Sequence, residues 1–554
     1  MYFYIQPSIT IISYIKYKRS IIINNKSNIK SHNIIENYQN TINDFSKSWD
    51  KNYKKLNTFF KSHNIKSSND IKTIKPYFRD WSNMKGHGEL LVRPKNNIEC
   101  AIILKTCYTC NILLTISAGK TNLTGSATPN GGVILSTSLL TEPNVEVDFK
   151  NKEASAPIGM PLEHFRSKIL ELTNMELYYP VDPTSRNDAY IGGTISCNAS
   201  GFIPGEKGAT RHWVKEIDFL LPNGDYVIIK RGEYISKNGF FNLIYDNKTI
   251  RLPVPTYKRP KIKNASGLYS DINGTLDLID LIIGSEGILG LVTSCRLGLS
   301  AKPKESLELF LALDSEVEAI DFHNFLYEYL NQDLSQITAL EYFGHNSQKY
   351  MNNREFLFSN KKQVGIYLQI PIFNDSIDKK TDEWVKILHL YNPNIDLDNI
   401  KVLNDPNNWK KFFEARHSIP DNAITQTKKL GGVSIISDTI VPVHNFSKYI
   451  KKVHKKLKQS KIEYLLFGHL GDCHLHFHLI PNQKQDKDAL KIYDYLVDLS
   501  SKLGGVYSAE HGTGKRKRND FFKCYGSEAV NMIKNLKNSI DPNNYLNNGN
   551  LIKQ

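Results

Sequence analysis

The feature that most constrains the fold is a stretch near the C-terminus, Phe467 to Pro481, which reads FGHLGDCHLHFHLIP. If the chain runs as a strand from Cys473 onward, successive side chains alternate between the two faces of that strand. Three histidines then share one face and three apolar residues share the other: His474, His476 and His478 against Leu475, Phe477 and Leu479. The pattern predicts a strand with an imidazole face and a core face.

A second polar stretch, YSAEHGTGKRKR from Tyr507 to Arg518, places Glu510 and His511 on a glycine-flanked loop, and His469 precedes the strand in a turn. Neutral imidazoles with one carboxylate suit zinc or another borderline divalent ion, and three protein ligands leave a position open for substrate. Histidines on a polar strand face can also simply be hydrogen-bonded or solvated. The spacing does not decide which imidazoles coordinate.

The chain is large enough for two or three domains, since 554 residues exceed what one hydrophobic core supports. Its 40% hydrophobic and 23% charged residues are typical of a globular protein. The sequence holds no run of about 18 apolar residues, so we expect no membrane-spanning helix.

The formal net charge of +15 comes from 71 Lys and Arg against 56 Asp and Glu, with lysines scattered through connecting segments. Scatter argues against a nucleic-acid groove, so no nucleic-acid partner is expected. The densest run, from Lys448 to Lys461, has apolar residues at helical spacing with lysines on the other side. A solvated helix face is the expected role, and contact with an anionic membrane surface is the alternative.

Seven cysteines form no paired pattern, which indicates a reducing compartment rather than secretion. Cys107 and Cys110 have dithiol spacing without a second pair, so we interpret them as packed thiols. The first 35 residues contain no Asp or Glu and five Lys or Arg, which resembles a mitochondrial presequence. A disordered extension explains the same bias. We therefore expect a mitochondrial protein, or one of the bacterial cytoplasm or the inner face of its membrane.

From Glu89 to Ser138 the pattern predicts strand, helix, strand, loop and strand. Asn96 can cap the helix, with Glu99 in the capping-box position. The loop from Gly119 to Gly132, GKTNLTGSATPNGG, follows an apolar strand. Glycine-rich loops can direct consecutive backbone N–H groups at one point, and a pyrophosphate suits such a site. The loop is neither a Walker A motif nor Gly-x-Gly-x-x-Gly.

Two later segments, Tyr178 to Gly201 and Asp277 to Thr293, also place small residues at the end of an apolar strand. Three such loops can converge on one long ligand that carries phosphates. Together these segments resemble the FAD-binding oxidoreductases of the vanillyl-alcohol oxidase/PCMH superfamily. The likeness is greatest to the branch with FAD-linked D-lactate dehydrogenases, the glycolate oxidase FAD subunit and D-2-hydroxyglutarate dehydrogenases, and it runs from about residue 76 to 552.

The resemblance implies an α+β fold: a PCMH-type FAD-binding domain of two subdomains, at residues 76–302, plus a cap domain with an antiparallel β-sheet covered by helices. The cap, the C-terminal domain of FAD-linked oxidases, spans 303–552, with its last residues returning to the FAD domain. Residues 1–75 are expected to be an N-terminal extension with a targeting segment and helices. Pro303 marks the expected boundary.

The family pyrophosphate loop, G-G-G-T-S-L-T-G, matches residues 118–125, with Lys120 in place of a glycine. Further family motifs match residues 180–183, 191–201, 284–293 and 541–549. The pyrophosphate loop has no His or Cys, so the FAD is expected to be noncovalent. The resemblance implies FAD contacts from Ala118, Gly119, Lys120, Thr121, Asn122, Leu123, Gly125, Asp182, Pro183, Gly192, Gly193, Asn198, Ser200, Gly201, Glu286, Gly287, Val292 and Asn547.

The family motifs G-H-x-G-D-G-N-x-H and E-H-G-x-G match residues 468–476 and 510–514, with Cys473 and His474 in place of glycine and asparagine. In the metal-dependent branch this implies a divalent ion, with zinc as first choice, bound by His469, His476 and Glu510. His474 or His478 can join that ligand set. A segment like W-x-x-R-E implies that Arg416 binds the substrate carboxylate. Ile436 stands where some members have a lysine, which weakens the case for a dicarboxylate.

The function implied is oxidation of a D-2-hydroxy acid, of the D-lactate, glycolate or D-2-hydroxyglutarate class, by hydride transfer to flavin N5. Arg416 would hold the carboxylate, the metal would bind the hydroxyl, and His511 would take its proton. The electron acceptor stays open among a quinone, an electron-transfer flavoprotein and a cytochrome, and a homodimer is allowed. Alternatives are an oxygen-using oxidase, an alkylglycerone-phosphate-synthase-like transferase, a degenerate FAD-binding subunit and a non-flavin metallohydrolase.

Overall fold

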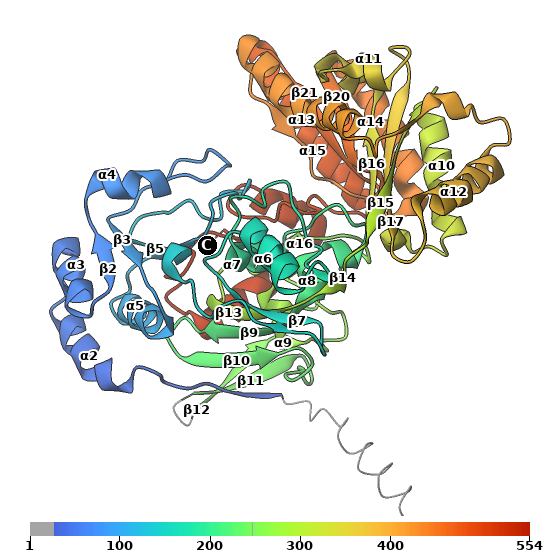
Figure 1. Ribbon diagram of the computed structural model, residues 1–554. Helices are drawn as coiled ribbons and strands as arrows, with labels where there is room; N and C mark the ends of the chain where they lie inside the picture. Colours follow the sequence, from blue (N-terminus) through green and yellow to red (C-terminus); the bar gives the residue numbers. More distant parts are fainter. Residues whose placement is uncertain (1–26, 246–247, 554) are drawn as a thin grey trace, which may run out of the picture.

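The computed structural model describes residues 27–245 and 248–553, and Figure 1 shows that they form two bodies. Most of the predicted targeting segment therefore lies outside the described residues. The N-terminal body contains every strand up to residue 301, and the C-terminal body contains a single large sheet that begins at residue 305. Pro303 lies in the connection between them.

The first sheet of the N-terminal body has the order β2-β3-β5-β4, with β3, β5 and β4 parallel. The predicted order of elements from residue 89 to 138 is confirmed. Asn96 caps α5 by accepting from the Glu99 backbone at 2.9 Å, but the Glu99 carboxylate accepts from Lys95 rather than from Asn96. The elements are α2 (Gln39–Lys47), α3 (Tyr53–Ser62), β2 (Lys66–Ser68), α4 (Ile71–Ile74), β3 (Leu90–Arg93), α5 (Asn97–Thr109), β4 (Leu114–Ser117) and β5 (Val133–Ser136).

The second sheet of this body has the order β10-β9-β13-β7-β6 and is antiparallel throughout. Its elements are β6 (Val147–Asp148), β7 (Glu153–Pro157), α6 (Leu162–Leu172), α7 (Ile191–Cys197), α8 (Thr210–Trp213), β9 (Val214–Leu220), β10 (Tyr226–Lys230), α9 (Leu278–Ile282) and β13 (Leu291–Gly298). Two small sheets complete the body: β1 (Asn28–Lys30), β11 (Phe240–Tyr245) and β12 (Lys248–Pro253), and β8 (Leu177–Tyr178) with β14 (Ser300–Ala301).

The C-terminal body is built on an antiparallel sheet with the order β18-β15-β17-β16-β20-β21-β19. Its strands are β15 (Glu305–Leu313), β16 (Ala339–Phe343), β17 (Val364–Ile372), β18 (Ile400–Val402), β19 (Ile435–Ile436), β20 (Glu463–His469) and β21 (His474–Ile480). Its helices are α10 (Glu316–Tyr329), α11 (Arg354–Leu357), α12 (Ile377–Tyr391), α13 (Pro406–Lys429), α14 (Val443–Ser460) and α15 (Asp486–Lys502). This is the helix-covered antiparallel sheet that the resemblance implied.

The predicted strand of alternating histidines is β21. Its three apolar residues pack into one core with the buried face of α14, through residues such as Phe446, Val453 and Leu457. Burial of that face confirms the helical spacing expected for the lysine-rich run. The imidazole face is also buried, and the loop that carries Glu510 lies beside His476 on that face.

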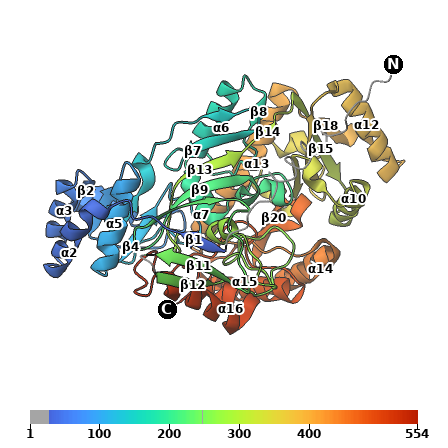
Figure 2. The ribbon, with the colours of Figure 1, turned by 90° about the horizontal axis from the view of Figure 1, so that it is seen from below.

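After the C-terminal body the chain returns to the N-terminal body through α16 (Arg518–Ile540), which lies beside β12 (Figure 2). The final segment then adds to the first sheet: the Leu114 amide donates to Tyr545, and the Asn547 amide donates to Leu114, at 2.9 and 2.8 Å. The two bodies are therefore joined by two crossings of the chain.

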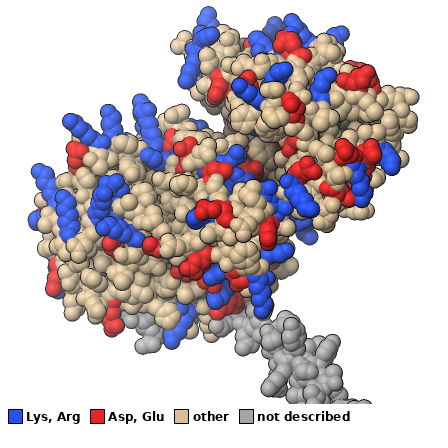
Figure 3. Space-filling model, in the orientation of Figure 1, with Lys and Arg blue, Asp and Glu red and all other residues tan. Residues whose placement is uncertain are grey.

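Basic and acidic side chains are interspersed over the face shown in Figure 3. None of the helices in the described part of the chain is long and apolar enough to cross a membrane. All seven cysteines are free; Cys107 is fully buried in the N-terminal core and Cys110 is half-buried.

Candidate functional site

One open cavity extends from the glycine-rich loops of the N-terminal body to the histidines of the C-terminal body. Gly119 lines one part of its wall, and His469, Glu510 and His511 line another. Every predicted FAD contact except Gly125 and Asn198 lines this cavity. The three loops singled out in the sequence do converge on one space.

The loop from Gly119 to Leu123 has five consecutive backbone N–H groups that donate to no protein acceptor within the described residues. The Asn122 side chain shapes the loop by accepting from the Thr124 and Ser126 amides at 2.8 and 3.1 Å. The hydroxyls of two further cavity-lining residues, Thr137 and Ser200, are buried without a partner in the same described part. Unpaired donors around one cavity are what a diphosphate-bearing ligand such as FAD requires.

Lys120, which replaces a glycine of the family loop, adopts a left-handed backbone with φ of 61°. Its ammonium donates to the Pro76 carbonyl at 3.0 Å and lies 4.4 Å from the centre of the Tyr77 ring. The Lys120 carbonyl also accepts from the amide of Trp81, whose side chain lines the cavity. Sequence reasoning missed Trp81, because it lies outside every glycine-rich segment.

Gly125 and Asn198, the two predicted FAD contacts that do not line the cavity, instead determine the backbone conformation of nearby loops. Gly125 has φ of 82°, and a Cβ there would lie 2.4 Å from the Met84 sulfur. Asn198 ends α7 in the left-handed conformation, and its side chain accepts from the Arg211 amide at 2.9 Å. Both residues shape loops that bound the cavity.

Glu286 lines the cavity but uses its carboxylate to join two loops. It accepts from the Ser126 hydroxyl at 2.6 Å and from the amides of Thr513 and Gly514 at 2.7 and 2.8 Å. Burial raises the pKa of this carboxyl. Glu286 therefore fixes the glycine-rich loop of the N-terminal body against the Glu510 loop.

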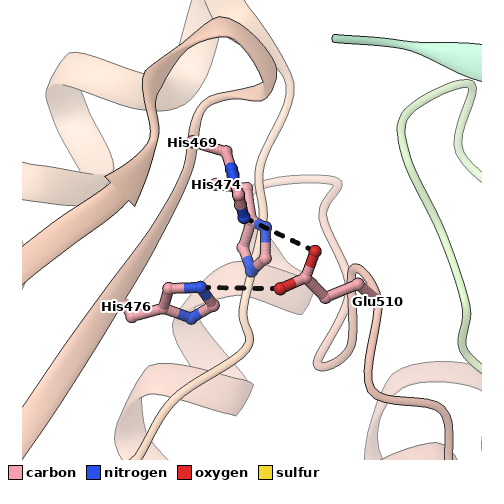
Figure 4. A group of neighbouring side chains, drawn as sticks. All are labelled: His469, His474, His476 and Glu510. Carbon is pink, nitrogen blue, oxygen red and sulfur yellow. Dashed lines mark ion pairs between the residues drawn. The ribbon is translucent and has the colours of Figure 1, made fainter. Parts of the chain in front are cut away.

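His469, His476 and Glu510 form the predicted metal group, shown in Figure 4. The Nε2 atoms of both histidines lie 3.6 Å from oxygens of Glu510, which is too far for a hydrogen bond. The other ring nitrogen of each is engaged: His469 Nδ1 contacts Glu341 at 2.6 Å, and His476 Nδ1 contacts the Ser437 carbonyl at 3.1 Å. Both Nε2 atoms thus lie beside Glu510, where they could bind an ion that displaces the proton from His469.

This donor set fits a divalent ion. Burial lowers the pKa of His476 to about 3, so its imidazole is neutral. Burial also opposes protonation of His469, but the carboxylates of Glu341 and Glu510 raise its pKa to about 10. The same negative charge that attracts a proton to His469 would attract a metal cation. Two imidazoles, one carboxylate and an orienting carboxylate behind one histidine are the usual surroundings of zinc.

The two other histidines of β21 have different partners. His474 belongs to the same group of donors, but its Nε2 lies 3.0 Å from Asp438. His478 Nε2 contacts the Ser434 hydroxyl, away from Glu510. Cys473, at a glycine position of the family motif, takes the left-handed conformation that position needs, with φ of 55°.

His511 borders the cavity and is held by Asp438. Its Nδ1 lies 3.4 Å from an Asp438 oxygen, and its backbone amide donates to that oxygen at 3.0 Å. Burial opposes ionisation of Asp438, yet the His511 ring and the Lys517 ammonium beside it keep its pKa well below the usual value. Burial lowers the pKa of His511, which favours the neutral imidazole. Asp438 was not among the predicted site residues, although it lies two residues after Ile436, the position where some family members have a lysine.

A buried lysine also enters the site. The Lys263 ammonium lies 3.3 Å from Asp472 and 3.3 Å from Glu510, and its side chain is only 2% exposed. Burial opposes its charge, but these two carboxylates raise its pKa. Lys263 therefore supplies a fixed positive charge that holds the Glu510 carboxylate in place.

Arg416 is not among the residues that line the cavity, but it lies against one that does. Its Nη2 donates to Glu341 at 2.8 Å, and its guanidinium lies 4.6 Å from the centre of the Phe202 ring, which lines the cavity. Among the described residues, the other guanidinium nitrogens donate to no protein group. Glu341 thus links Arg416 to His469, a connection that sequence reasoning did not foresee.

Two family models match the chain: an FAD binding domain over residues 89–230 and the C-terminal domain of FAD linked oxidases over residues 374–551. The first covers the glycine-rich loop and α7, and the second covers Arg416 and the metal group. Both parts of the cavity therefore fall within matched segments.

Curated relatives cover most of the chain. Glycolate oxidase subunit GlcD of Bacillus subtilis is 24% identical over 83% of this chain and 88% of its own, and D-lactate dehydrogenase of Anaerostipes hadrus is 23% identical over 84% and 90%. The mitochondrial D-2-hydroxyglutarate dehydrogenase of Danio rerio is 23% identical over 84% and 79%. Among solved structures, 4-ethylphenol oxidase from Gulosibacter chungangensis shares the fold at a TM-score of 0.62, with 14% identity over 94% of this chain and 98% of its own.

Proposed function

Because the chain belongs to the FAD-linked oxidoreductases of the D-lactate dehydrogenase, glycolate oxidase and D-2-hydroxyglutarate dehydrogenase branch, we propose that it oxidises a D-2-hydroxy acid with the help of a divalent metal ion. The observation that supports this most directly is the single cavity that contains both Gly119 and His511. A ligand of the length of FAD can occupy this cavity while the hydroxy acid lies beside the histidines.

The N-terminal loops would hold FAD without a covalent bond. The free amides from Gly119 to Leu123 suit its diphosphate, and the buried hydroxyls of Thr137 and Ser200 offer further donors. When bound, FAD supplies the two-electron acceptor for the hydride that leaves Cα of the substrate.

His469, His476 and Glu510 would hold the metal ion, with zinc as the first candidate. A bound ion supplies a Lewis acid that lowers the pKa of the substrate hydroxyl. Glu341 orients His469, and Lys263 holds Glu510, so the ligands are positioned before any ion arrives.

His511 would take the hydroxyl proton at Nε2. Asp438 lies 3.4 Å from Nδ1 and would favour the tautomer with its proton on that nitrogen, which leaves the Nε2 lone pair free. The Lys517 ammonium, 2.9 Å from Asp438, keeps that carboxylate charged and therefore an acceptor. Asp438 is thus a positioning residue for His511.

Arg416 would bind the substrate carboxylate through the guanidinium nitrogens that Glu341 leaves free. Stacking on Phe202 and pairing with Glu341 restrict the guanidinium plane, so the substrate is oriented without further ordering of the side chain. Its pairing with Glu341 also connects substrate binding to the metal ligand His469.

Replacing Arg416 with methionine is expected to lower kcat/KM by roughly 10- to 100-fold, mostly through KM, since a hydrogen bond between charged groups contributes about 1.5–3 kcal/mol. Steady-state kinetics against the hydroxy acid would measure the change. Lys410→Met removes one positive charge from the exposed face of the same helix and should leave both constants unchanged. Equal losses in the two variants would contradict the assigned role.

Anaerobic reduction of the bound flavin tests the function as a whole. D-lactate, glycolate and D-2-hydroxyglutarate are offered in turn, each with and without a chelator, and L-lactate serves as the stereochemical control. We expect a D-hydroxy acid to bleach the flavin absorption, and we expect the chelator to slow this reduction. A yellow protein that no hydroxy acid reduces would contradict the proposal and favour a binding subunit or a transferase.

A further inference from the structure

We propose that one end of the C-terminal body docks on an anionic lipid membrane through a basic tip, defined as the adjacent turns at residues 428–433, 458–461 and 482–487. The Gln483 amide donates to the Leu430 carbonyl at 3.3 Å, and the Gln485 side chain donates to the Lys461 carbonyl at 3.3 Å. The Val433 amide donates to Asp486 at 2.8 Å. These bonds make the three turns one surface.

The basic tip carries a concentrated positive charge. Its exposed lysines are Lys428, Lys429, Lys458, Lys461, Lys484 and Lys487. Over the described ranges none of them forms an ion pair, whereas exposed lysines outside the tip do, such as Lys379 with Asp375 and Lys491 with Asp488. The one carboxylate in the tip, Asp486, accepts from the Val433 amide.

The charge continues along α14, which contains no acidic residue. This helix exposes a row of lysines that leads away from the tip: Lys448, Lys451, Lys452, Lys455 and Lys456. Like charges placed together repel one another, so such a row gains from an anionic surface nearby.

The basic tip also exposes aliphatic side chains on a tight loop, Leu430-Gly431-Gly432-Val433. Leu430 is 38% exposed and Val433 is 64% exposed. Gly431 has φ of 70°, and a Cβ on Gly432 would lie 2.0 Å from the Pro481 carbonyl, so the glycines are what allow this turn. Aliphatic groups flanked by lysines suit the boundary between lipid headgroups and acyl chains.

A lipid surface explains these features better than an acidic protein does. Three turns at the end of a sheet offer little of the roughly 800 Å² that each partner of a stable protein interface buries. Two aliphatic side chains on a projecting loop, by contrast, can enter a headgroup layer singly. We therefore assign the basic tip to an anionic bilayer.

The position of the tip leaves the catalytic cavity accessible. Strand β21 runs from His474 beside the metal group to Ile480 next to the tip. Asn482 is six positions after His476, which corresponds to about 20 Å at the rise of an extended strand. Docking through the tip would bring the cavity close to the membrane without covering it.

Binding to sedimentable vesicles of phosphatidylcholine, with and without phosphatidylserine, tests the proposal on the full chain. Wild-type protein should bind only the vesicles that contain phosphatidylserine, and salt should weaken the binding. A tip variant with glutamine at Lys428, Lys429, Lys484 and Lys487 should bind at least ~100-fold more weakly. A second variant, with Leu430 and Val433 replaced by serine, should also bind more weakly at high salt.

The matched control places glutamine at Lys54, Lys61, Lys66 and Lys72, four exposed lysines of the N-terminal body. It should bind like wild type, and all variants should keep wild-type turnover with a soluble dye as acceptor. The proposal would be overturned if the wild-type protein did not bind anionic vesicles, or if the control variant lost as much binding as the tip variant. If the wild-type protein does not bind vesicles and the tip variant reduces an acidic electron-carrier protein more slowly than wild type does, the proposal is also overturned. The tip would then bind a protein partner.

Discussion

Replacing His511 with alanine is expected to lower kcat by about 10²- to 10⁴-fold, the range that a positioned general base contributes. The protein should stay yellow, because no amide or hydroxyl proposed to hold FAD belongs to His511. Asp438→Asn should lower kcat as well, since an amide can present a donor to Nδ1 and favour the wrong tautomer. Stopped-flow measurement of flavin reduction at saturating substrate gives the rate directly.

His417 provides the matched histidine. It stacks on Phe413, with ring centres 3.7 Å apart, and its Nδ1 contacts the Phe413 carbonyl. His417→Ala should reduce flavin at nearly the wild-type rate. Full turnover in His511→Ala, with FAD and metal content unchanged, would remove His511 from the mechanism.

The second large effect is expected at the metal group. His476→Ala removes one of three proposed ligands, so its metal affinity should fall by more than 100-fold, the upper end of what losing only an orienting partner costs. Elemental analysis of the purified protein and a titration with zinc would measure this without reference to turnover. Activity should fall with metal content and should no longer respond to a chelator.

His478 is the internal control for this prediction, because it lies on the same face of the same strand two residues later. Its Nε2 contacts Ser434 rather than the metal group. Both substitutions remove a buried imidazole, so their costs in folding stability should be similar. If His478→Ala lost as much metal as His476→Ala, the assignment of ligands would be wrong.

The parts of the fold that follow from local pattern could be predicted. Alternation along β21, the cap at Asn96 and the apolar positions of α14 are each determined by neighbours within a few residues. The glycine-rich loops were recognised because they follow apolar strands. The resemblance then supplied the order of the domains and the candidate ligands, which local pattern alone left open.

The parts that depend on residues far apart in the sequence could not be predicted. Glu341 meets Arg416 and His469 only because β16 and β20 pair and α13 packs nearby. Lys263 reaches Glu510 from a loop of the other body. No spacing in the sequence encodes either contact, since each partner alone resembles an ordinary surface charge.

The return of the chain after α16 has a consequence for biogenesis. Asn547 accepts from the Ile116 amide at 2.7 Å and donates to the Glu286 carbonyl at 2.8 Å, and it forms part of the cavity wall. The wall that faces the cofactor is therefore incomplete until residue 547 has been synthesised and folded back. Flavin loading should accordingly wait until residue 547 has left the ribosome, and a nascent chain stalled before this point should be colourless.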